Sequence, residues 1–190
     1  MDLINRLIDC NCVKIGKFTL RNGDISRYYF DMKNLISHPK LLSQVGDLMY
    51  ELIRDRCDVI CGVPMGGLPL ATYISTKYHI PMIIPRKSVK GYGMGKQIEG
   101  EYSKDTTCII IEDVITTGKS SMECVKLIKN SKAKLVGFAS IIDRSTKKNL
   151  RINKKIISHL KINVPTYKKN KLPNSLKSIP ITTPGSRYIK

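Results

Sequence analysis

The chain has 190 residues, a length that suits one domain with a core of its own. A net charge of +18 and an apolar fraction of 42% indicate a basic globular protein, and no run approaches the roughly 18 apolar residues of a membrane span. The amino-terminal residues lack a signal-peptide pattern, so we expect a cytoplasmic protein that has no membrane partner.

The first predicted elements are two short strands around a turn, at Phe18–Asp24 and Ser26–Asp31. We expect residues 1–36 to form a small cap beside the main sheet. His38–Arg56 then repeats apolar residues at helical spacing, with Pro39 in the first turn, and this predicts a helix.

From residue 59 onward, short apolar strands alternate with helices. The predicted strands are Val59–Val63, Pro81–Pro85, Thr107–Ile111 and Lys134–Asp143, and the predicted helices are Leu68–Tyr78 and Ser120–Asn130. This alternation predicts an α/β fold in which helices flank a parallel sheet. The run Lys87–Lys104 has four glycines and no apolar period, so we expect a flexible loop there.

The positive charge is concentrated at the carboxyl end. Residues 145–190 hold 12 Lys or Arg and no acid, whereas the first 144 residues hold 21 basic and 15 acidic residues. Such a basic segment could bind nucleic acid, and that function stays open as an alternative. We expect a small polyanionic substrate instead, because the charges are single or paired among Ile, Asn, Ser and Pro.

The six cysteines do not follow a zinc-binding pattern. Cys10 and Cys12 are too close together for a usual zinc pair, and Cys57 and Cys61 have no matching pair downstream. Cys61 and Cys108 lie in apolar runs, where a free cysteine behaves as a small core residue. We therefore expect reduced thiols and no metal held by protein side chains.

Three predicted strands deliver polar or glycine-rich segments to one edge of the sheet. They are followed by Pro64-Met65-Gly66-Gly67, by the run from Glu112 to Ser120, and by Asp143-Arg144. Ligands of parallel sheets bind at the carboxyl ends of the strands, so we expect these segments to share one crevice.

The run from Thr116 to Ser120 has the composition of a phosphate-binding turn. Its hydroxyls, its backbone N–H groups and Gly118 open a helix, where the free amides and the helix dipole favour an anion. It is not an ATP-binding P-loop, because Asp113 stands where that motif needs glycine. Glu112 and Asp113 would repel a bare phosphate but suit the hydroxyls of a sugar. The stretch therefore predicts a ribose 5-phosphate site.

The same run, IIIEDVITTGKS, resembles the phosphoribosyl pyrophosphate (PRPP) motif of the type I phosphoribosyltransferases. Further motifs resemble those of the orotate phosphoribosyltransferases, and they follow the family order over nearly the whole chain. They are FTLRNGDISRYYFD, VPMGGLPLAT, RKSVKGYG, IIDR, and the ending NVPTY with IPITTPGSR. A single domain of that fold is implied, with a hood, a flexible catalytic loop at 87–104 and a basic segment at 145–190.

The resemblance implies transfer of ribose 5-phosphate from PRPP to orotate, with Mg²⁺ bound mainly through PRPP and a homodimer with shared active sites. Lys90 and Asp113 are implied as catalytic residues. The implied PRPP ligands are Arg21, Met65, Gly66, Arg86, Lys87, Lys90, Tyr92, Glu112, Asp113, Val114, Ile115, Thr116, Thr117, Gly118, Lys119 and Ser120, and the implied orotate ligands are Tyr29, Phe30, Thr116 and Arg144.

Several positions depart from the family pattern, and three of them are implied ligands. Arg21 replaces the usual Lys, Gly66 stands where many bacterial members have Lys, and Lys119 stands where small residues are usual. Two related alternatives remain: an enzyme of the same fold that acts on a purine, and a regulator that binds PRPP without turnover. The lysine in the loop, Lys90, argues against both.

Overall fold

The computed structural model describes residues 2–20, 22–86, 97–130, 133–147 and 149–182. The chain forms two compact units. The core unit is the continuous segment Pro39–Ile162, and the terminal unit combines Met1–His38 with Asn163–Lys190.

The core unit is built on a six-stranded sheet with the order β5-β4-β3-β6-β7-β8. The strands are β3 (Val59–Gly62), β4 (Met82–Pro85), β5 (Ile98–Glu99), β6 (Thr107–Ile115), β7 (Lys134–Asp143) and β8 (Ile156–Lys161). Neighbouring strands are parallel except for β5, which is antiparallel to β4. The predicted parallel sheet is confirmed, and its four predicted strands are present.

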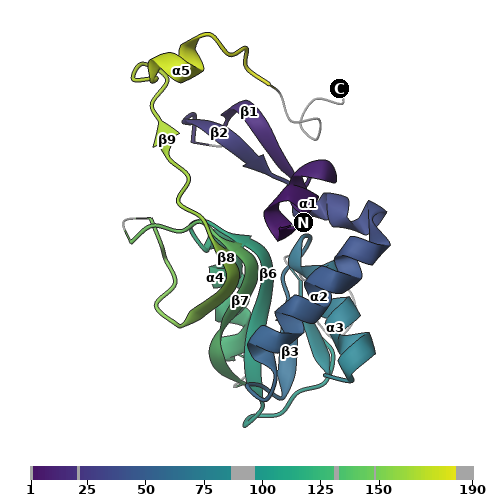
Figure 1. Ribbon diagram of the computed structural model, residues 1–190. Helices are drawn as coiled ribbons and strands as arrows, with labels where there is room; N and C mark the ends of the chain where they lie inside the picture. The colour runs from purple at the N-terminus through teal and green to yellow at the C-terminus, as the bar shows by residue number, and fades with distance from the viewer. Residues whose placement is uncertain (1, 21, 87–96, 131–132, 148, 183–190) are drawn as a thin grey trace. The chain divides into compact units, whose positions relative to one another are not determined.

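The sheet is covered by the helices α2 (Pro39–Ile53), α3 (Gly67–Tyr78) and α4 (Lys119–Asn130). On the face of α4, Cys108 and Ile110 of β6 share a buried cluster with Cys124 of α4. On the other face, Gly62 of β3 lies against Ala71 of α3, where an added Cβ would be 2.9 Å from the Ala71 Cβ. Figure 1 shows α2 and α3 side by side in the same layer, as their mutual contacts require.

The helix α2 forms because its apolar residues recur every fourth position. Leu41, Val45, Met49 and Ile53 are all at most 5% exposed, so one stripe of the helix is buried. Burying such a side chain contributes about 1.5–3 kcal/mol. Helix α2 packs on β7, β8 and α3, as its predicted apolar face requires.

The terminal unit contains a three-stranded antiparallel sheet with the order β1-β2-β9. Its elements are α1 (Leu3–Asp9), β1 (Val13–Thr19), β2 (Ile25–Phe30), the 3-10 helix η1 (Met32–Ser37), β9 (Thr166–Tyr167) and α5 (Asn174–Lys177). The N–H of Thr182 donates to the carbonyl of Lys17 at 2.7 Å, so the carboxyl-terminal segment also contacts β1.

The first predicted strand was placed wrongly. β1 ends at Thr19, and the residues that follow make the turn, in which the N–H of Leu20 donates to the carbonyl of Asp24 at 2.8 Å. The sequence misled because β1 carries two lysines and a glycine, so its alternation is weak. Lys17 is nevertheless buried beside Phe18.

The strands β5, β8 and β9 and the helices α1 and α5 were not predicted. Strands β5 and β9 have only two residues each, which is too short for a periodic pattern. Strand β8 lies at the edge of its sheet and includes Ser158, His159 and Lys161, so its sequence looks polar. Of the predicted loop 87–104, residues 87–96 lie outside the described part of the chain.

Candidate active site

The carboxyl ends of β3, β6 and β7 lie side by side, because these strands are adjacent and parallel. The N–H of Val63 donates to the carbonyl of Ile111 at 3.1 Å, and the N–H of Arg144 donates to the carbonyl of Ile115 at 2.9 Å. These bonds hold the segments after β3 and β7 against β6. The predicted meeting of three strand ends at one edge is confirmed.

Strand β6 is longer than predicted. It continues through both acids to Ile115, because its pairing with β7 continues from Glu112 opposite Ser140 to Ile115 opposite Asp143. The prediction that the strand ends at Ile111 is therefore wrong. Successive side chains of a strand point to opposite faces, so the two neighbouring acids have different surroundings.

Glu112 points to the face covered by α4. Its side chain is buried, with the residue only 6% exposed, and its Oε1 accepts a hydrogen bond from the hydroxyl of Ser121 at 2.7 Å. Ser121 is itself fully buried in the first turns of α4. A buried carboxylate is stable only when hydrogen bonds compensate for its lost hydration, and Ser121 supplies one of them.

Asp113 lies against the loop after β3. Its Oδ1 accepts a hydrogen bond from the N–H of Val114 at 2.8 Å. A Cβ added to Gly66 would lie 1.9 Å from its Oδ2, so the carboxylate fills the space that a side chain at position 66 would need. The glycine at this departure from the family pattern therefore has a structural reason.

The turn between β6 and α4 presents small polar groups to solvent. Thr116, Thr117, Lys119 and Ser120 are exposed, and α4 begins at Lys119. Gly118 has φ +70°, and a Cβ there would lie 2.5 Å from Cγ1 of Ile152, so only glycine fits without strain. The first-turn N–H groups of a helix have no partner within that helix, and with the dipole they favour an anion at this turn.

The segment after β7 supports the same turn. The N–H of Arg151 donates to the carbonyl of Thr117 at 3.0 Å. Arg144 is half-buried, and its burial lowers the pKa of the guanidinium from its ordinary value. Arginine stays charged in proteins, so Arg144 offers a cationic fork at the edge of the sheet.

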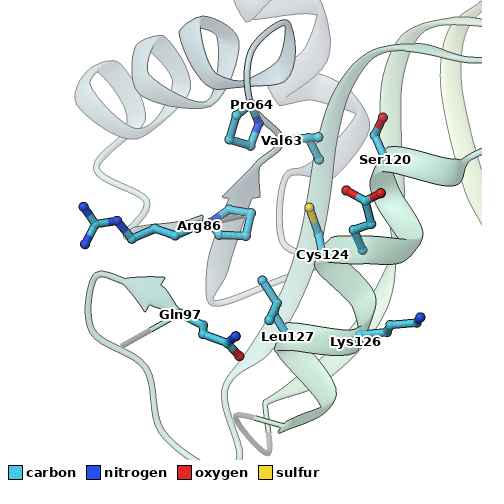
Figure 2. A pocket seen from close by; sticks show the side chains of 10 residues that line it. Val63, Pro64, Arg86, Gln97, Ser120, Cys124, Lys126 and Leu127 are labelled. Atoms are coloured by element: carbon cyan, nitrogen blue, oxygen red, sulfur yellow. The ribbon is translucent and has the colours of Figure 1, made fainter. Parts of the chain in front are cut away.

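A cavity of about 220 Å³ opens beside the turn, between α4 and the ends of β3 and β4. Val63, Pro64, Pro85, Arg86, Gln97, Ser120, Glu123, Cys124, Lys126 and Leu127 line it. In Figure 2, Cys124 and Leu127 extend from α4 toward the side on which Arg86 lies. The guanidinium of Arg86 forms an ion pair with Glu99 of β5, so this predicted pyrophosphate ligand already has a carboxylate partner.

The remaining predicted residues fall into three groups. Arg21, Lys87, Lys90 and Tyr92 lie outside the described residues. Tyr29 and Phe30 end β2 in the terminal unit, and Tyr29 contacts the ring of Phe18, with centroids 5.5 Å apart. Met65 is 65% exposed in the loop after β3.

Sequence reasoning missed Ser121 and the supporting residues Arg151 and Ile152. Ser121 lies three residues before Cys124 and seven before Ile128, both of which are buried on α4. A polar residue on a buried helical face is unusual. This polar residue on a buried face was the signal that could have indicated Ser121. The predicted phosphate turn ended one residue before it, at Ser120.

All six cysteines are free thiols, and Cys61 and Cys108 are fully buried core residues as predicted. Among the residues that the structure describes, no three His, Cys, Asp or Glu side chains gather as metal ligands. Within those same residues, no helix is long and apolar enough to cross a membrane.

Comparison with known proteins identifies the family. Residues 31–173 match the model of the phosphoribosyl transferase domain. The orotate phosphoribosyltransferase of Methanosphaera stadtmanae is 41% identical over 143 residues, and that of Pyrococcus abyssi is 38% identical over 146 residues. Each match covers 75% of this chain and 80% of the relative.

A solved structure agrees with these matches. The crystal structure of orotate phosphoribosyltransferase from Aeropyrum pernix superposes with a TM-score of 0.73 at 26% identity, over 85% of this chain and 94% of that one. This chain thus shares its overall fold with that enzyme. The chain belongs to the phosphoribosyltransferase family and, within it, to the orotate phosphoribosyltransferases of pyrimidine biosynthesis.

Proposed function

We propose that this chain joins orotate to the ribose 5-phosphate group of PRPP, giving orotidine 5′-monophosphate and pyrophosphate. The bond between the anomeric carbon and pyrophosphate breaks, and a bond from that carbon to a ring nitrogen of orotate forms. The observation that carries the proposal is the pair Glu112 and Asp113 beside an exposed helix-opening turn, with Arg144 on the neighbouring strand end.

In this proposal the turn from Thr116 to Ser120 binds the 5-phosphate, and Glu112 and Asp113 accept hydrogen bonds from the ribose hydroxyls. The helix dipole favours the phosphate by about 0.3–2 kcal/mol, and several backbone N–H groups add to it. Val114 and Ile115 connect the two acids to the phosphate-binding turn, and their backbone lies along the substrate. Asp113 also favours the positive charge that develops on the sugar as pyrophosphate leaves.

Pyrophosphate is the second part of the proposal. The backbone of Met65 and Gly66 approaches it, and Arg86 with Lys87 supplies cations. Lys90 stabilises the charge on the leaving group, which is its catalytic role. The family resemblance implies that Arg21 and Tyr92 also contact PRPP. It further implies that the loop at 87–104 closes over the active site of the neighbouring subunit, so we propose a homodimer.

Orotate carries a carboxylate, and we propose that Arg144 binds it through two parallel hydrogen bonds. Thr116 contributes a further contact, and Tyr29 and Phe30 lie along the ring. These aromatic residues belong to the terminal unit, which we propose as the hood of the enzyme. To contact pyrophosphate, the guanidinium of Arg86 must either break its ion pair with Glu99 or bind both groups at once.

Mg²⁺ belongs to the proposal as a companion of PRPP, where it neutralises phosphate charge. Magnesium is usually held by one or two carboxylates together with substrate phosphates and water. The phosphate oxygens of PRPP and water would supply most of that donor set, so no cluster of protein ligands is required. Six free cysteines also suit the reducing cytoplasm, which we propose as the location.

The test is pyrophosphate release from PRPP with Mg²⁺ in the presence of orotate, uracil, hypoxanthine or adenine. We expect release with orotate and not with uracil, hypoxanthine or adenine. Lys90→Ala should lower kcat about 100-fold, as loss of one aimed cation does, while Lys104→Ala, an exposed lysine of the same predicted loop, should leave kcat unchanged. Release with uracil or a purine instead of orotate would refute the proposal.

A second variant tests the nucleobase site. Arg144→Lys keeps the charge but loses the planar fork, so KM for orotate should rise about tenfold with KM for PRPP nearly unchanged. An equal rise in both KM values would remove Arg144 from its proposed role.

A further inference from the structure

Ser121 is a buried polar residue in the apolar face of α4. It is fully buried. On the same helical face, Ile128 is also fully buried and Cys124 is only 5% exposed. A hydroxyl in such surroundings is stabilised by a hydrogen-bond partner, because a buried polar group has lost its hydration. Its partner is Oε1 of Glu112, at 2.7 Å.

This bond restricts Glu112 in a way that matters for a ligand. The residue is only 6% exposed, so a ligand can reach a small part of the carboxylate. The hydrogen bond to Oε1 helps to set the orientation of the carboxylate that a substrate hydroxyl would meet. Loss of this bond would remove one restraint on the terminal torsion of Glu112, which has a broad energy profile.

The same bond joins two segments that act on different ends of one substrate. Ser121 follows the phosphate turn directly, in the second position after Lys119, and Glu112 belongs to β6. We propose that Ser121 is a positioning residue of the PRPP site, which orients Glu112 and fixes the spacing between the ribose hydroxyls and the 5-phosphate. This inference rests on the proposed role of Glu112.

The physical reason is preorganisation. A charged hydrogen bond is directional, and a site held within about 0.5 Å of its working geometry loses little entropy when the substrate binds. Because Ser121 contacts Glu112 and not the substrate, its loss should weaken PRPP binding without altering the orotate contacts. An effect confined to one substrate separates positioning from general damage to the fold.

The experiment compares Ser121→Thr with Ser121→Val in the full-length enzyme. The two side chains have the same branching and nearly the same volume, so any overpacking beside Cys124 is common to both. Threonine keeps the hydroxyl and valine lacks it. We expect KM for PRPP to be about tenfold higher in the valine variant than in the threonine variant, which equals about 1.4 kcal/mol. KM for orotate should differ less than about twofold between them.

Ser140→Ala is the control for loss of a buried hydroxyl. Ser140 is fully buried and lies opposite Glu112 on β7, and its hydroxyl makes no hydrogen bond within the described residues. We expect its KM for PRPP to stay within about twofold of the unmodified enzyme. A rise equal to that of Ser121→Val would contradict a specific role for Ser121.

A double-mutant cycle shows whether Ser121 acts through Glu112. In the Glu112→Ala background, the valine and threonine variants should have the same KM for PRPP, since the group to be positioned is gone. A tenfold difference that persists there overturns the inference. An unchanged KM for Glu112→Ala itself would instead refute the proposed role of Glu112. If Glu112→Ala raises KM for PRPP while Ser121→Val and Ser121→Thr have equal KM in the enzyme that keeps Glu112, only the inference about Ser121 fails.

Discussion

The core unit and the terminal unit obtain their strand partners from different distances along the chain. In the core unit, Pro39–Ile162, apolar strands and helices alternate along one continuous segment. In the terminal unit, β2 pairs with its neighbour β1 and also with β9, where Ile25 lies opposite Tyr167. The core unit can therefore be predicted from local periodicity, whereas the terminal unit depends on pairing between the two ends of the chain.

The basic carboxyl-terminal segment is therefore divided between two structural tasks. Residues 156–161 form the edge strand β8 of the core unit, and residues 166–167 form β9 of the terminal unit. Buried Val164 and Leu176 also belong to it. A segment that completes both sheets has a structural role of its own, which weakens the alternative that it serves nucleic-acid binding.

The largest expected effect is deletion of residues 163–190, which removes β9 from the terminal unit and leaves the core unit its whole sequence. Amide hydrogen exchange in β1 and β2 should accelerate at least about 100-fold, while β3 and β6 keep their protection. Orotate turnover should be lost because Tyr29 and Phe30 would no longer be held. Unchanged exchange together with lost binding of RNA would favour the nucleic-acid alternative.

Next in size is a contrast inside the core unit. A Cβ at Gly67 would lie 2.1 Å from the carbonyl oxygen of Ile111, which is backbone of a central strand, so Gly67→Ala should cost about 3 kcal/mol of unfolding free energy. At Gly66 the obstacle is the side chain of Asp113. Gly66→Ala should cost about 1 kcal/mol but lower kcat/KM about tenfold.

Urea unfolding and steady-state kinetics on both variants check this contrast. Equal stability losses would show that the loop after β3 can move away from β6. Unchanged kcat/KM in Gly66→Ala would show that the position of Asp113 does not limit the reaction.

A smaller effect is expected at the surface of the core unit. Asp47 of α2 accepts hydrogen bonds from Lys77 at 2.8 Å, from Tyr73 at 2.7 Å and from Tyr78 at 2.8 Å, all on α3. Its side chain is 39% exposed, so solvent screens the pair, and Asp47→Asn should cost at most about 1 kcal/mol.

The pH dependence of this cost follows from the pKa of Asp47. The bond from Lys77 is the main cause that lowers this pKa below its ordinary value. The contribution of Asp47 is therefore present above the unfolded pKa of about 3.9 and is lost as the pH falls through the folded pKa. Urea unfolding should show a larger difference between Asp47→Asn and the unmodified protein at pH 7 than at pH 3. An equal difference at both values would show that charge plays no part.

The smallest effect is expected in the terminal unit, at the ion pair that joins its two chain segments. Lys168 contacts Asp24 at 2.8 Å, and Lys168 is the main cause that lowers the pKa of Asp24. Because the lysine side chain is 70% exposed, Lys168→Ala should shift Tm by less than about 2 °C in thermal unfolding. A larger shift would mean that this pair, rather than β9, holds the chain ends together.

The success of the sequence predictions follows the same division. The helix α2 was predicted from apolar residues that recur every fourth position, and the strand β7 from a continuous apolar run. Both patterns are local in the sequence, and β7 matches its predicted bounds Lys134–Asp143. The edge strand β8 was missed because an edge needs few apolar residues. The roles of Arg21, Lys87, Lys90 and Tyr92 stay predictions, since these residues lie outside the described part of the chain.

The sequence by itself determined the α/β alternation, the family, and the presence of two acids before a phosphate turn, because each depends on residues that are neighbours in the chain. Only the tertiary structure decided that β6 continues through these acids. That pairing with β7 turns Glu112 toward Ser121 and Asp113 toward Gly66. Such contacts join residues far apart in sequence, and their geometry depends on strand register and helix packing, which local spacing does not encode.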